Sequence, residues 1–411
     1  MDKASKHDFH GRSRNSRRDD LELPTRCLAE QDEIEEVCER IRSAGRFAFD
    51  TEFVMEDRYA AEVCLIQLAT DDEVVLVDPL DSIDPSPIWQ LVADPNVETI
   101  VHAGMEDLSL CKAYGGMTPQ RVFDCQIACG LITVHYPLSL SRMTRQLLNV
   151  RLRKSQTLTD WRRRPLSPEQ LHYAALDVIY LPAVHRAITD RLEKLGRMDW
   201  MREEMEKFTR PETYERDLSE NILKLKGAGS LDGKGLAIAR ELVKARDALA
   251  EQFNRPVRGV IRDHLIVEIA RNRWTTPSDI KSLRGLHLRA EGIRALAAAA
   301  KRGVNTPREQ WPAVAQSTEE TEEEAALALL IGAVIRAYCA EHTIAHQLVA
   351  VKQDAHRFAQ AFVRGEQQPA NIPFANGWRG HSVGAVVERV LAGDAALSVT
   401  HTKDGPRATI R

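Results

Sequence analysis

The chain has 411 residues, a length at which two or three domains are expected rather than one. Hydrophobic residues make up 43% of it and charged residues 28%, which is enough apolar material for folded cores. No run approaches the roughly 18 apolar residues of a membrane-spanning helix, so no transmembrane segment is expected. The net charge of −4 combines basic and acidic segments, so its sign indicates no class of partner.

The first 19 residues are predicted to be a disordered basic N-terminus. They carry six basic side chains: Lys3, Lys6, Arg12, Arg14, Arg17 and Arg18. No apolar segment follows these residues, so a secretory signal peptide is not indicated.

Seven cysteines are scattered along the chain without a Cys-x-x-Cys pair. The closest two, Cys125 and Cys129, fall on a helical pattern with apolar neighbours. Free thiols in a core are therefore favoured, with a zinc or disulfide role as the alternative. Because free thiols persist in a reducing compartment, the predicted location is the cytoplasm.

Residues 20–206 alternate between strand-like and helix-like patterns. An amphipathic helix is predicted over 31–45, where an apolar stripe ends at a glycine. Four short apolar runs are predicted to be strands: 46–53, 61–70, 73–80 and 98–104. A further helix is expected to begin near Met105. Three consecutive strands followed by alternating strand and helix predict a mixed α/β sheet with helices packed on it.

The rest of the chain is predicted to be helical and to form two lobes. Residues 207–215 are polar, contain a proline and show no period, so they are predicted to be a linker. A helical domain is expected over 216–303, a second linker with an acidic end over 304–324, and a second helical domain over 325–400. The two lobes have similar length and texture, which is typical of related small domains, but no strict repeat is visible.

Three segments each present an acidic side chain near the end of a predicted element. Asp50 and Glu52 stand two positions apart at the end of a buried strand, so both leave from the same face of that strand. Asp107 falls in the first turn of the helix that follows the fourth strand. Tyr173 and Asp177 are four residues apart on a helical pattern and therefore share one helix face.

Taken singly, each of these features has an ordinary structural explanation. Asp50 with Glu52 suits a strand-end charge pair or an ion pair with a basic residue. Asp107 suits a helix N-terminus, where the helix dipole favours an acid. Tyr173 with Asp177 suits a pair on an exposed helix surface. The combination of the three segments, with their order and surroundings, is what indicates a shared site.

In combination, the segments resemble the three motifs of the DEDD superfamily of 3′-5′ exonucleases, in the version with a tyrosine in the third motif. The stretches that carry the motifs are FDTEF (49–53), HAGMEDL (102–108) and YAALD (173–177). Flanking stretches are similar too: CLIQLA (64–69), VDPL (77–80), FDCQIA (123–128) and the run 154–181. The whole set, over about 20–395, resembles bacterial ribonuclease D.

The helical part carries a resemblance of its own. Residues 216–303 resemble the HRDC domain of ribonuclease D and RecQ-type helicases. The stretch NGWRGHSVG (376–384) resembles the second HRDC-like lobe of ribonuclease D. The resemblance therefore implies a ribonuclease H-like α/β exonuclease domain over 20–206, followed by two small all-α HRDC-like domains.

The resemblance also implies a reaction. It assigns four carboxylates as ligands of two divalent cations, Mg²⁺ or Mn²⁺: Asp50, Glu52, Asp107 and Asp177. Hard cations of this kind prefer oxygen ligands, which agrees with that assignment. Tyr173 would orient the attacking water. The implied activity is metal-dependent 3′-5′ hydrolysis of RNA to nucleoside 5′-monophosphates, with tRNA precursors and other structured RNAs as substrates and a monomer as the acting form.

Substrate contact is predicted from basic surface, because RNA binding depends on cations that meet phosphates. Residues 142–164 carry eight basic side chains against one acid, and a solvated helix face is the alternative for this run. The predicted contacts are Phe53, His102, Arg151, Arg153, Lys154, Arg162 and Arg164. His102 equally suits a buried core histidine, and Trp161 is expected to be packed. Candidates for added charge in the first helical domain are Lys224, Lys226, Lys234 and Lys244.

Two other functions fit parts of the pattern. A DNA 3′-5′ exonuclease would use the same acids, but no polymerase or helicase motif accompanies them. A catalytically inactive nucleic-acid-binding scaffold would be expected to lack at least one acid, and all four acids and the tyrosine are present. A metal-dependent exoribonuclease is therefore the favoured function.

Overall fold

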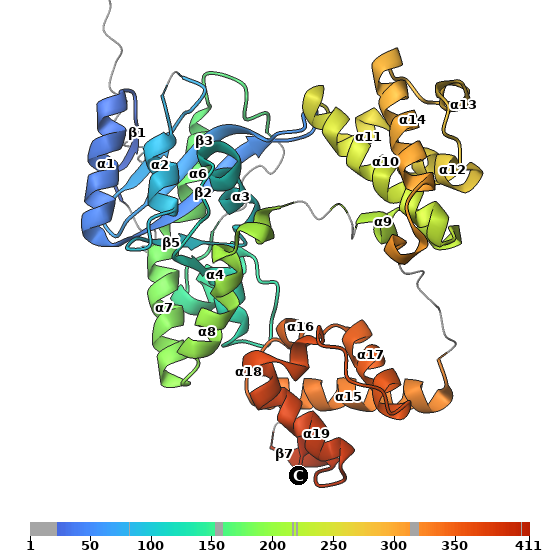
Figure 1. Ribbon diagram of the computed structural model, residues 1–411. Coiled ribbons are helices and arrows are strands. Elements are labelled where there is room, and N and C mark those ends of the chain that lie inside the picture. Colours follow the sequence, from blue (N-terminus) through green and yellow to red (C-terminus); the bar gives the residue numbers. More distant parts are fainter. Residues whose placement is uncertain are drawn as a thin grey trace, which may run out of the picture. The chain divides into compact units, whose positions relative to one another are not determined.

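The computed structural model describes residues 23–81, 83–152, 159–215, 218, 221–312, 320–403 and 405–411. The predicted basic N-terminus, 1–19, lies outside these residues. The chain forms two compact units (Figure 1). The first comprises Met1–Glu52, Cys64–Thr213 and Glu319–Arg411, and the second comprises Phe53–Val63 and Tyr214–Thr318.

A six-stranded mixed sheet forms the centre of the first unit, in the order β1-β4-β3-β2-β5-β6. Its strands are β1 (Thr25–Cys27), β2 (Arg46–Val54), β3 (Glu62–Ala69), β4 (Val74–Val77), β5 (Glu98–Val101) and β6 (Val122–Asp124). β3 and β4 are antiparallel, whereas β1 with β4, β2 with β5 and β5 with β6 are parallel. The predicted mixed sheet is confirmed, and the sequence missed only β1 and β6, each of three residues.

The helices that accompany this sheet are α1 (Gln31–Ala44), α2 (Ser86–Val92), α3 (Met105–Gly115), α4 (Cys125–Gly130), α5 (Leu140–Leu148), α6 (Pro168–Ile179), α7 (Leu181–Lys194) and α8 (Met198–Met205). α1 and α3 confirm the predicted helices. α1 begins with a capping box between Glu30 and Glu33 and ends at Gly45, whose φ of 73° is easiest for glycine. Two 3₁₀ turns, Glu206–Thr209 and Pro211–Tyr214, occupy much of the predicted first linker.

β2 lies between β3 and β5, which explains its continuous apolar run. Phe47, Ala48 and Phe49 are all at most 1% exposed. Phe49 also packs edge-to-face on Trp89 of α2, with ring centroids 6.1 Å apart. A strand covered on both faces carries such a continuous apolar run, and in β2 this run ends where its acids begin.

The C-terminal part of the first unit is mostly helical. Its elements are α15 (Glu322–Glu341), α16 (His346–Val349), α17 (Lys352–Val363), a 3₁₀ turn (Pro373–Ala375), α18 (Gly377–Arg379), a π-helical turn (Gly380–Gly384), α19 (Ala385–Leu391), β7 (Leu397–Thr402) and β8 (Gly405–Ile410). β7 and β8 form an antiparallel pair that the sequence did not predict. Alternating β-branched residues in 397–402 favour this extended structure, so the lobe is not wholly helical.

Trp378 anchors this lobe on α8 within the first unit. Its ring is 3% exposed and stacks on Trp200, with centroids 4.5 Å apart. The indole Nε1 donates to Glu204 at 2.6 Å, and Arg379 pairs with the same carboxylate at 2.6 Å. A buried carboxylate with two such partners is well compensated, so the cluster stabilises the packing of the lobe.

The second unit contains the predicted first helical domain. Its helices are α9 (Asn221–Lys224), α10 (Gly233–Gln252), α11 (Val257–Val260), α12 (Asp263–Asn272), α13 (Pro277–Lys281) and α14 (Ala290–Val304). α10 and α14 approach each other closely at Gly303. A Cβ at this position would lie 2.4 Å from the Cα of Ile238, so the contact requires a glycine. Among the described residues, no helix is both long enough and apolar enough to cross a membrane.

Candidate active site

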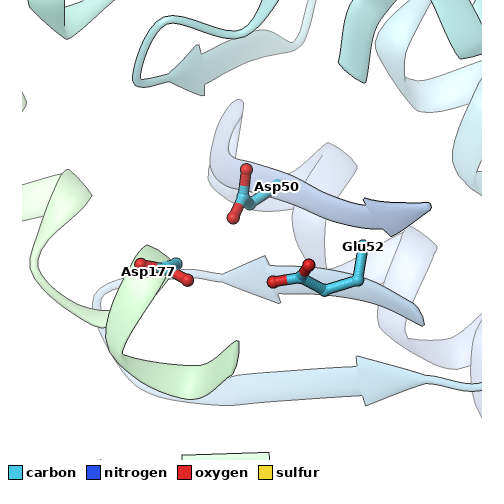
Figure 2. A group of neighbouring side chains, drawn as sticks. All are labelled: Asp50, Glu52 and Asp177. Carbon is cyan, nitrogen blue, oxygen red and sulfur yellow. The ribbon is translucent and has the colours of Figure 1, made fainter. Parts of the chain in front are cut away.

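Three carboxylates converge where β2 faces α6. Asp50 and Glu52 come from β2, and Asp177 comes from α6 (Figure 2). One oxygen from each side chain lies within 4.8 Å of the others. All three side chains are half-buried. Residues that are more than a hundred positions apart in the sequence therefore form one acidic cluster.

Asp107, the fourth predicted acid, lies beside the cluster and is turned toward Thr51. Its Oδ1 accepts a hydrogen bond from the backbone amide of Thr51 at 3.1 Å and a second one from the Thr51 hydroxyl. Asp107 is 8% exposed, and its charge contributes to raising the pKa of Asp50. The four acids therefore act on one another, although only three of them present converging oxygens.

α6 begins with a capping box that fixes where its acid and tyrosine lie. The Ser167 hydroxyl accepts from the amide of Gln170 at 3.2 Å, and the Gln170 side chain accepts from the amide of Ser167 at 2.9 Å. Two turns later, the Tyr173 hydroxyl donates a hydrogen bond to Asp177. The two residues share one face of the helix, as their spacing predicts.

Asp124, at the end of β6, positions the start of α3 and thereby Asp107. Its carboxylate accepts from the amides of Ala103 and Gly104, both at 3.2 Å, and also caps α4. Ala103 has a φ of 59°, so this loop needs support of that kind. No role for Asp124 is predicted from the sequence alone. An acid at a strand end directly before a helical pattern is the signal that would have identified it.

The cluster is electrostatically crowded. Burial, with added repulsion from neighbouring acids, raises the pKa of Glu52 to about 8 and that of Asp50 well above its usual value. Burial likewise raises the pKa of Asp177 to about 7, although the hydrogen bond from Tyr173 opposes this. Burial also raises the pKa of Asp107, against the hydrogen bonds from Thr51.

This donor set fits a hard divalent cation. Within the described part of the chain, none of Asp50, Glu52 and Asp177 forms an ion pair with a lysine or arginine. Convergent carboxylates without a basic partner repel one another, and a bound cation relieves that repulsion. Mg²⁺ and Mn²⁺ prefer such oxygen ligands.

The other predicted substrate residues fall in different settings. Arg153 and Lys154 lie outside the described residues. Phe53 follows Glu52 directly and is half-buried, and Arg151 is exposed. Arg162 is exposed as well, and its Nε lies 3.5 Å from the Asp160 carboxylate.

His102 lies in the connection between β5 and α3, just before the second motif's acid. Burial lowers its pKa to about 4, so its ring is neutral at physiological pH. Its Nδ1 is buried and has no hydrogen-bond partner among the described residues. A neutral ring with an unused nitrogen is compatible with both of its predicted roles, as a ligand contact and as a core histidine.

An open cavity of 440 Å³ adjoins Tyr173. Its lining includes Asp160, Trp161, Arg163 and Gln170. Trp161 is packed, at 9% exposure, with its ring 6.1 Å from that of Tyr173. Arg163 is exposed. The cavity therefore places a cation and an aromatic surface beside the tyrosine of the third motif.

Comparison with known families agrees with this geometry. Residues 26–193 match the 3′-5′ exonuclease family, and residues 235–290 match the HRDC domain. The fold and the site therefore define a 3′-5′ exonuclease domain followed by an HRDC domain. A second HRDC-like domain, in the C-terminal lobe, stays a prediction.

Similarity to individual proteins extends over nearly the whole chain. The chain is 32% identical over 384 residues to ribonuclease D of Jannaschia sp., which covers 90% of this chain and 96% of that relative. It is 29% identical over 380 residues to ribonuclease D of Bartonella henselae, covering 92% of each. The crystal structure of Escherichia coli RNase D superposes with a TM-score of 0.74 at 25% identity, covering 90% of this chain and 99% of that one. The chain belongs to the ribonuclease D family and is a 3′-5′ exoribonuclease.

Proposed function

We propose that this exoribonuclease trims the 3′ ends of structured RNAs, tRNA precursors above all, and releases nucleoside 5′-monophosphates. Four carboxylates would hold two divalent cations, Mg²⁺ or Mn²⁺: Asp50, Glu52, Asp107 and Asp177. The observation that carries the proposal is the convergence of three of these side chains within 4.8 Å. The tRNA substrate is carried over from the family resemblance. Escherichia coli RNase D, which this chain resembles in fold, is described as an exoribonuclease involved in structured RNA processing.

The acids and Tyr173 would have different roles in the reaction. When bound, the cations would lower the pKa of a water and stabilise the attacking and leaving oxygens of an in-line displacement. The Tyr173 hydroxyl donates a hydrogen bond to Asp177, and burial beside the acids raises its pKa, so the hydroxyl stays protonated. Its oxygen is then free to accept a hydrogen bond from the attacking water. Tyr173 would therefore orient that water rather than deprotonate it.

The cavity beside Tyr173 supports an RNA-binding site next to the scissile bond. Arg163 is exposed on its lining and can meet a phosphate, while the packed Trp161 gives it an apolar wall. Arg151 is also exposed and remains a proposed contact. Phe53 and His102, next to the first and second motifs, remain proposed contacts for the terminal nucleotide.

A cluster of basic side chains in the second unit supports the proposal that the helical domain makes an additional contact with RNA. An open cavity of 290 Å³ is lined by Lys226, Arg258, Arg262, Asp263 and His264. Asp263 pairs with the buried Arg246 at 2.6 Å, so its charge is already compensated. The remaining lining is basic. Of the four lysines proposed from the sequence, Lys226 lines this cavity, whereas Lys244 pairs with Glu241 at 3.0 Å.

A monomer in the cytoplasm is the proposed acting form. Six of the seven cysteines are buried and all seven are free thiols, which supports a reducing compartment. The monomer is carried over from the resemblance alone, and light scattering after size-exclusion chromatography tests it.

The substrate is tested with three matched polymers. These are a tRNA precursor with a 3′ trailer, an unstructured RNA of the same length, and the DNA version of that RNA. We expect stepwise removal of the trailer, release of 5′-monophosphates, and much slower loss of DNA. Equal loss of DNA would favour the DNA exonuclease alternative. An untouched trailer would contradict the tRNA substrate.

A further inference from the structure

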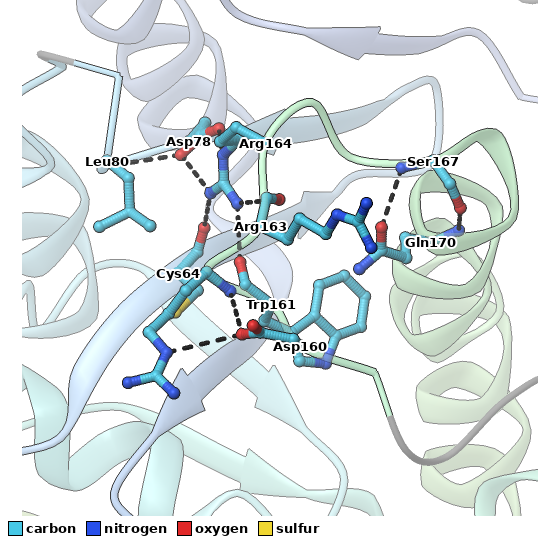
Figure 3. A network of polar contacts seen from close by, with 10 residues as sticks. Cys64, Asp78, Leu80, Asp160, Trp161, Arg163, Arg164, Ser167 and Gln170 are labelled. Carbon is cyan, nitrogen blue, oxygen red and sulfur yellow. Dashed lines mark hydrogen bonds and ion pairs between the residues drawn. The ribbon is translucent and has the colours of Figure 1, made fainter. Parts of the chain in front are cut away.

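Arg164 lies in the turn that leads into α6, and its guanidinium is surrounded by acceptors of the protein itself (Figure 3). Its Nε and Nη2 donate to the two carboxylate oxygens of Asp78, at 2.5 and 2.6 Å. Nη2 also donates to the Cys64 carbonyl at 2.7 Å. Nη1 donates to the carbonyls of Trp161 at 2.7 Å and Arg163 at 3.1 Å. A guanidinium has five N–H donors, and these contacts use all of them.

These contacts tie the turn before α6 to two strands of the sheet. Asp78 directly follows β4, and Cys64 belongs to β3. β3 lies between β4 and β2, the strand that carries the first two acids of the site. α6, whose N-cap Ser167 lies three residues after Arg164, carries the third acid and the tyrosine. Arg164 therefore links the two halves of the site through the sheet.

We propose that Arg164 is a positioning residue, which sets the separation between Asp177 on α6 and the acids Asp50 and Glu52 on β2. The inference rests on the proposed cation site, because that site needs carboxylate oxygens from both elements. An arginine that grips a carboxylate through two parallel bonds fixes direction as well as distance. With its donors already used, Arg164 is not available for an RNA phosphate. We therefore propose the positioning role in place of the substrate contact predicted from the sequence, although Arg164 also lines the cavity beside Tyr173.

Arg164→Lys tests this role, because lysine keeps the charge but cannot form the two-pronged pair. We expect kcat to fall about 10–100-fold, which is the typical effect of substituting a group that orients the ligands of a metal. The Mn²⁺ affinity, measured directly by titration, should fall with it. RNA affinity in chelator, and the dependence of that affinity on salt, should stay as in the wild type. Arg186→Lys is the matched control, since Arg186 forms an exposed pair with Asp71 in the same unit.

Asp78→Asn approaches the same contact from the other side. The positioning role predicts that kcat and Mn²⁺ affinity both fall. Because both residues act through one contact, the double variant should be no less active than the less active of the two single variants. If Arg164 instead bound RNA, Asp78→Asn would release it, and RNA affinity would hold or rise without loss of kcat. Weaker RNA binding by Arg164→Lys, with a smaller salt slope, would overturn the inference.

Two further results separate the possible failures. If a variant loses only thermal stability, and its folded fraction binds Mn²⁺ and turns over as the wild type does, Arg164 is structural and the positioning role is wrong. If the wild type itself needs no divalent cation, the proposed cation site is wrong, whichever way the variants behave.

Discussion

Thr51 holds Asp107 through two hydrogen bonds to a single carboxylate oxygen. Its backbone amide donates at 3.1 Å, and its hydroxyl donates to the same Oδ1. Thr51 stands between Asp50 and Glu52 on β2 and is 6% exposed, with its side chain on the opposite face of the strand from theirs. One short stretch of β2 therefore supplies two acids of the site and holds Asp107 in place.

Thr51→Val tests this contact, because valine keeps the shape and removes the hydroxyl. We expect a loss of about 1–3 kcal/mol in the free energy of unfolding, since a buried carboxylate loses one donor. We also expect weaker Mn²⁺ binding, measured by titration. Thr99→Val is the control: Thr99 is a buried threonine on β5 whose hydroxyl has no partner among the described residues. An equal effect of both substitutions would contradict the role of Thr51.

The raised pKa values predict how pH acts on the metal-free protein. The pKa of Glu52 is about 8 and that of Asp177 about 7, whereas in an unfolded chain such groups titrate near ~4. The folded protein therefore holds protons that the unfolded chain has released. Stability from these groups is complete below about pH 4 and is lost as pH rises toward 8. In chelator, Tm should fall from pH 5 to pH 8, and saturating Mn²⁺ should raise it more at pH 8 than at pH 5.

Asp50→Asn should raise the Tm of the metal-free protein at pH 8, because an amide in this buried site needs neither ionisation nor a retained proton. The same substitution should weaken Mn²⁺ binding. Glu35→Gln, at an exposed acid of α1, is the control and should change neither property. A lower Tm for Asp50→Asn in chelator would show that the acids are stabilised by contacts other than a cation.

Trp378 should hold the C-terminal lobe on α8. Trp378→Ala removes the stack on Trp200 and the bond to Glu204, so we expect a loss of about 3–5 kcal/mol, the range for large aromatic residues in cores. Trp378→Phe keeps an aromatic ring and should lose less. Urea unfolding monitored by tryptophan fluorescence measures both. Equal stability of the wild type and Trp378→Ala would contradict the packing.

The basic cavity of the helical domain should contribute to RNA affinity but not to the chemistry. Charge reversal at Lys226, Arg258 or Arg262 should weaken binding of a long RNA and lower its salt slope by about one per lost phosphate contact. Cleavage of a dinucleotide should be unchanged. Lys301→Glu, at an exposed cation outside this cavity, is the control. Unchanged affinity and salt slope in all three variants would remove the helical domain from RNA binding.

Three of the predicted acids, Asp50, Glu52 and Asp177, converge in the structure, and their positions follow from local periodicity. Asp50 and Glu52 share a strand face and Tyr173 and Asp177 share a helix face, which fixed spacings predict. Residues that hold those acids depend on contacts between distant segments. Thr51 and Asp124 have ordinary places in a strand and at a helix cap, and their roles appear only once α3 packs against the sheet.

The contacts of Arg164 also depend on segments that are distant in the sequence, so its surroundings could not be predicted. In the sequence it belongs to a run of cations, and that run predicts phosphate contact. The carboxylate and carbonyl that engage it come from Asp78, just after β4, and from Cys64 on β3, both far away in the sequence. Charge patterning cannot distinguish an arginine that faces solvent from one whose donors are used inside the fold. β1 and β6 were missed because three residues are too few for a period to show.

The convergent carboxylates are proposed to form a divalent-cation site that removes nucleotides from RNA 3′ ends. The most direct measurement follows 3′-labelled RNA by product chromatography, with Mg²⁺, with Mn²⁺ and with chelator, for the wild type and Asp50→Asn. A divalent-cation site predicts release of nucleoside 5′-monophosphates by the wild type with either cation, none in chelator, and a loss of at least about 100-fold in Asp50→Asn. Undiminished release in chelator, or full activity of Asp50→Asn, would contradict it.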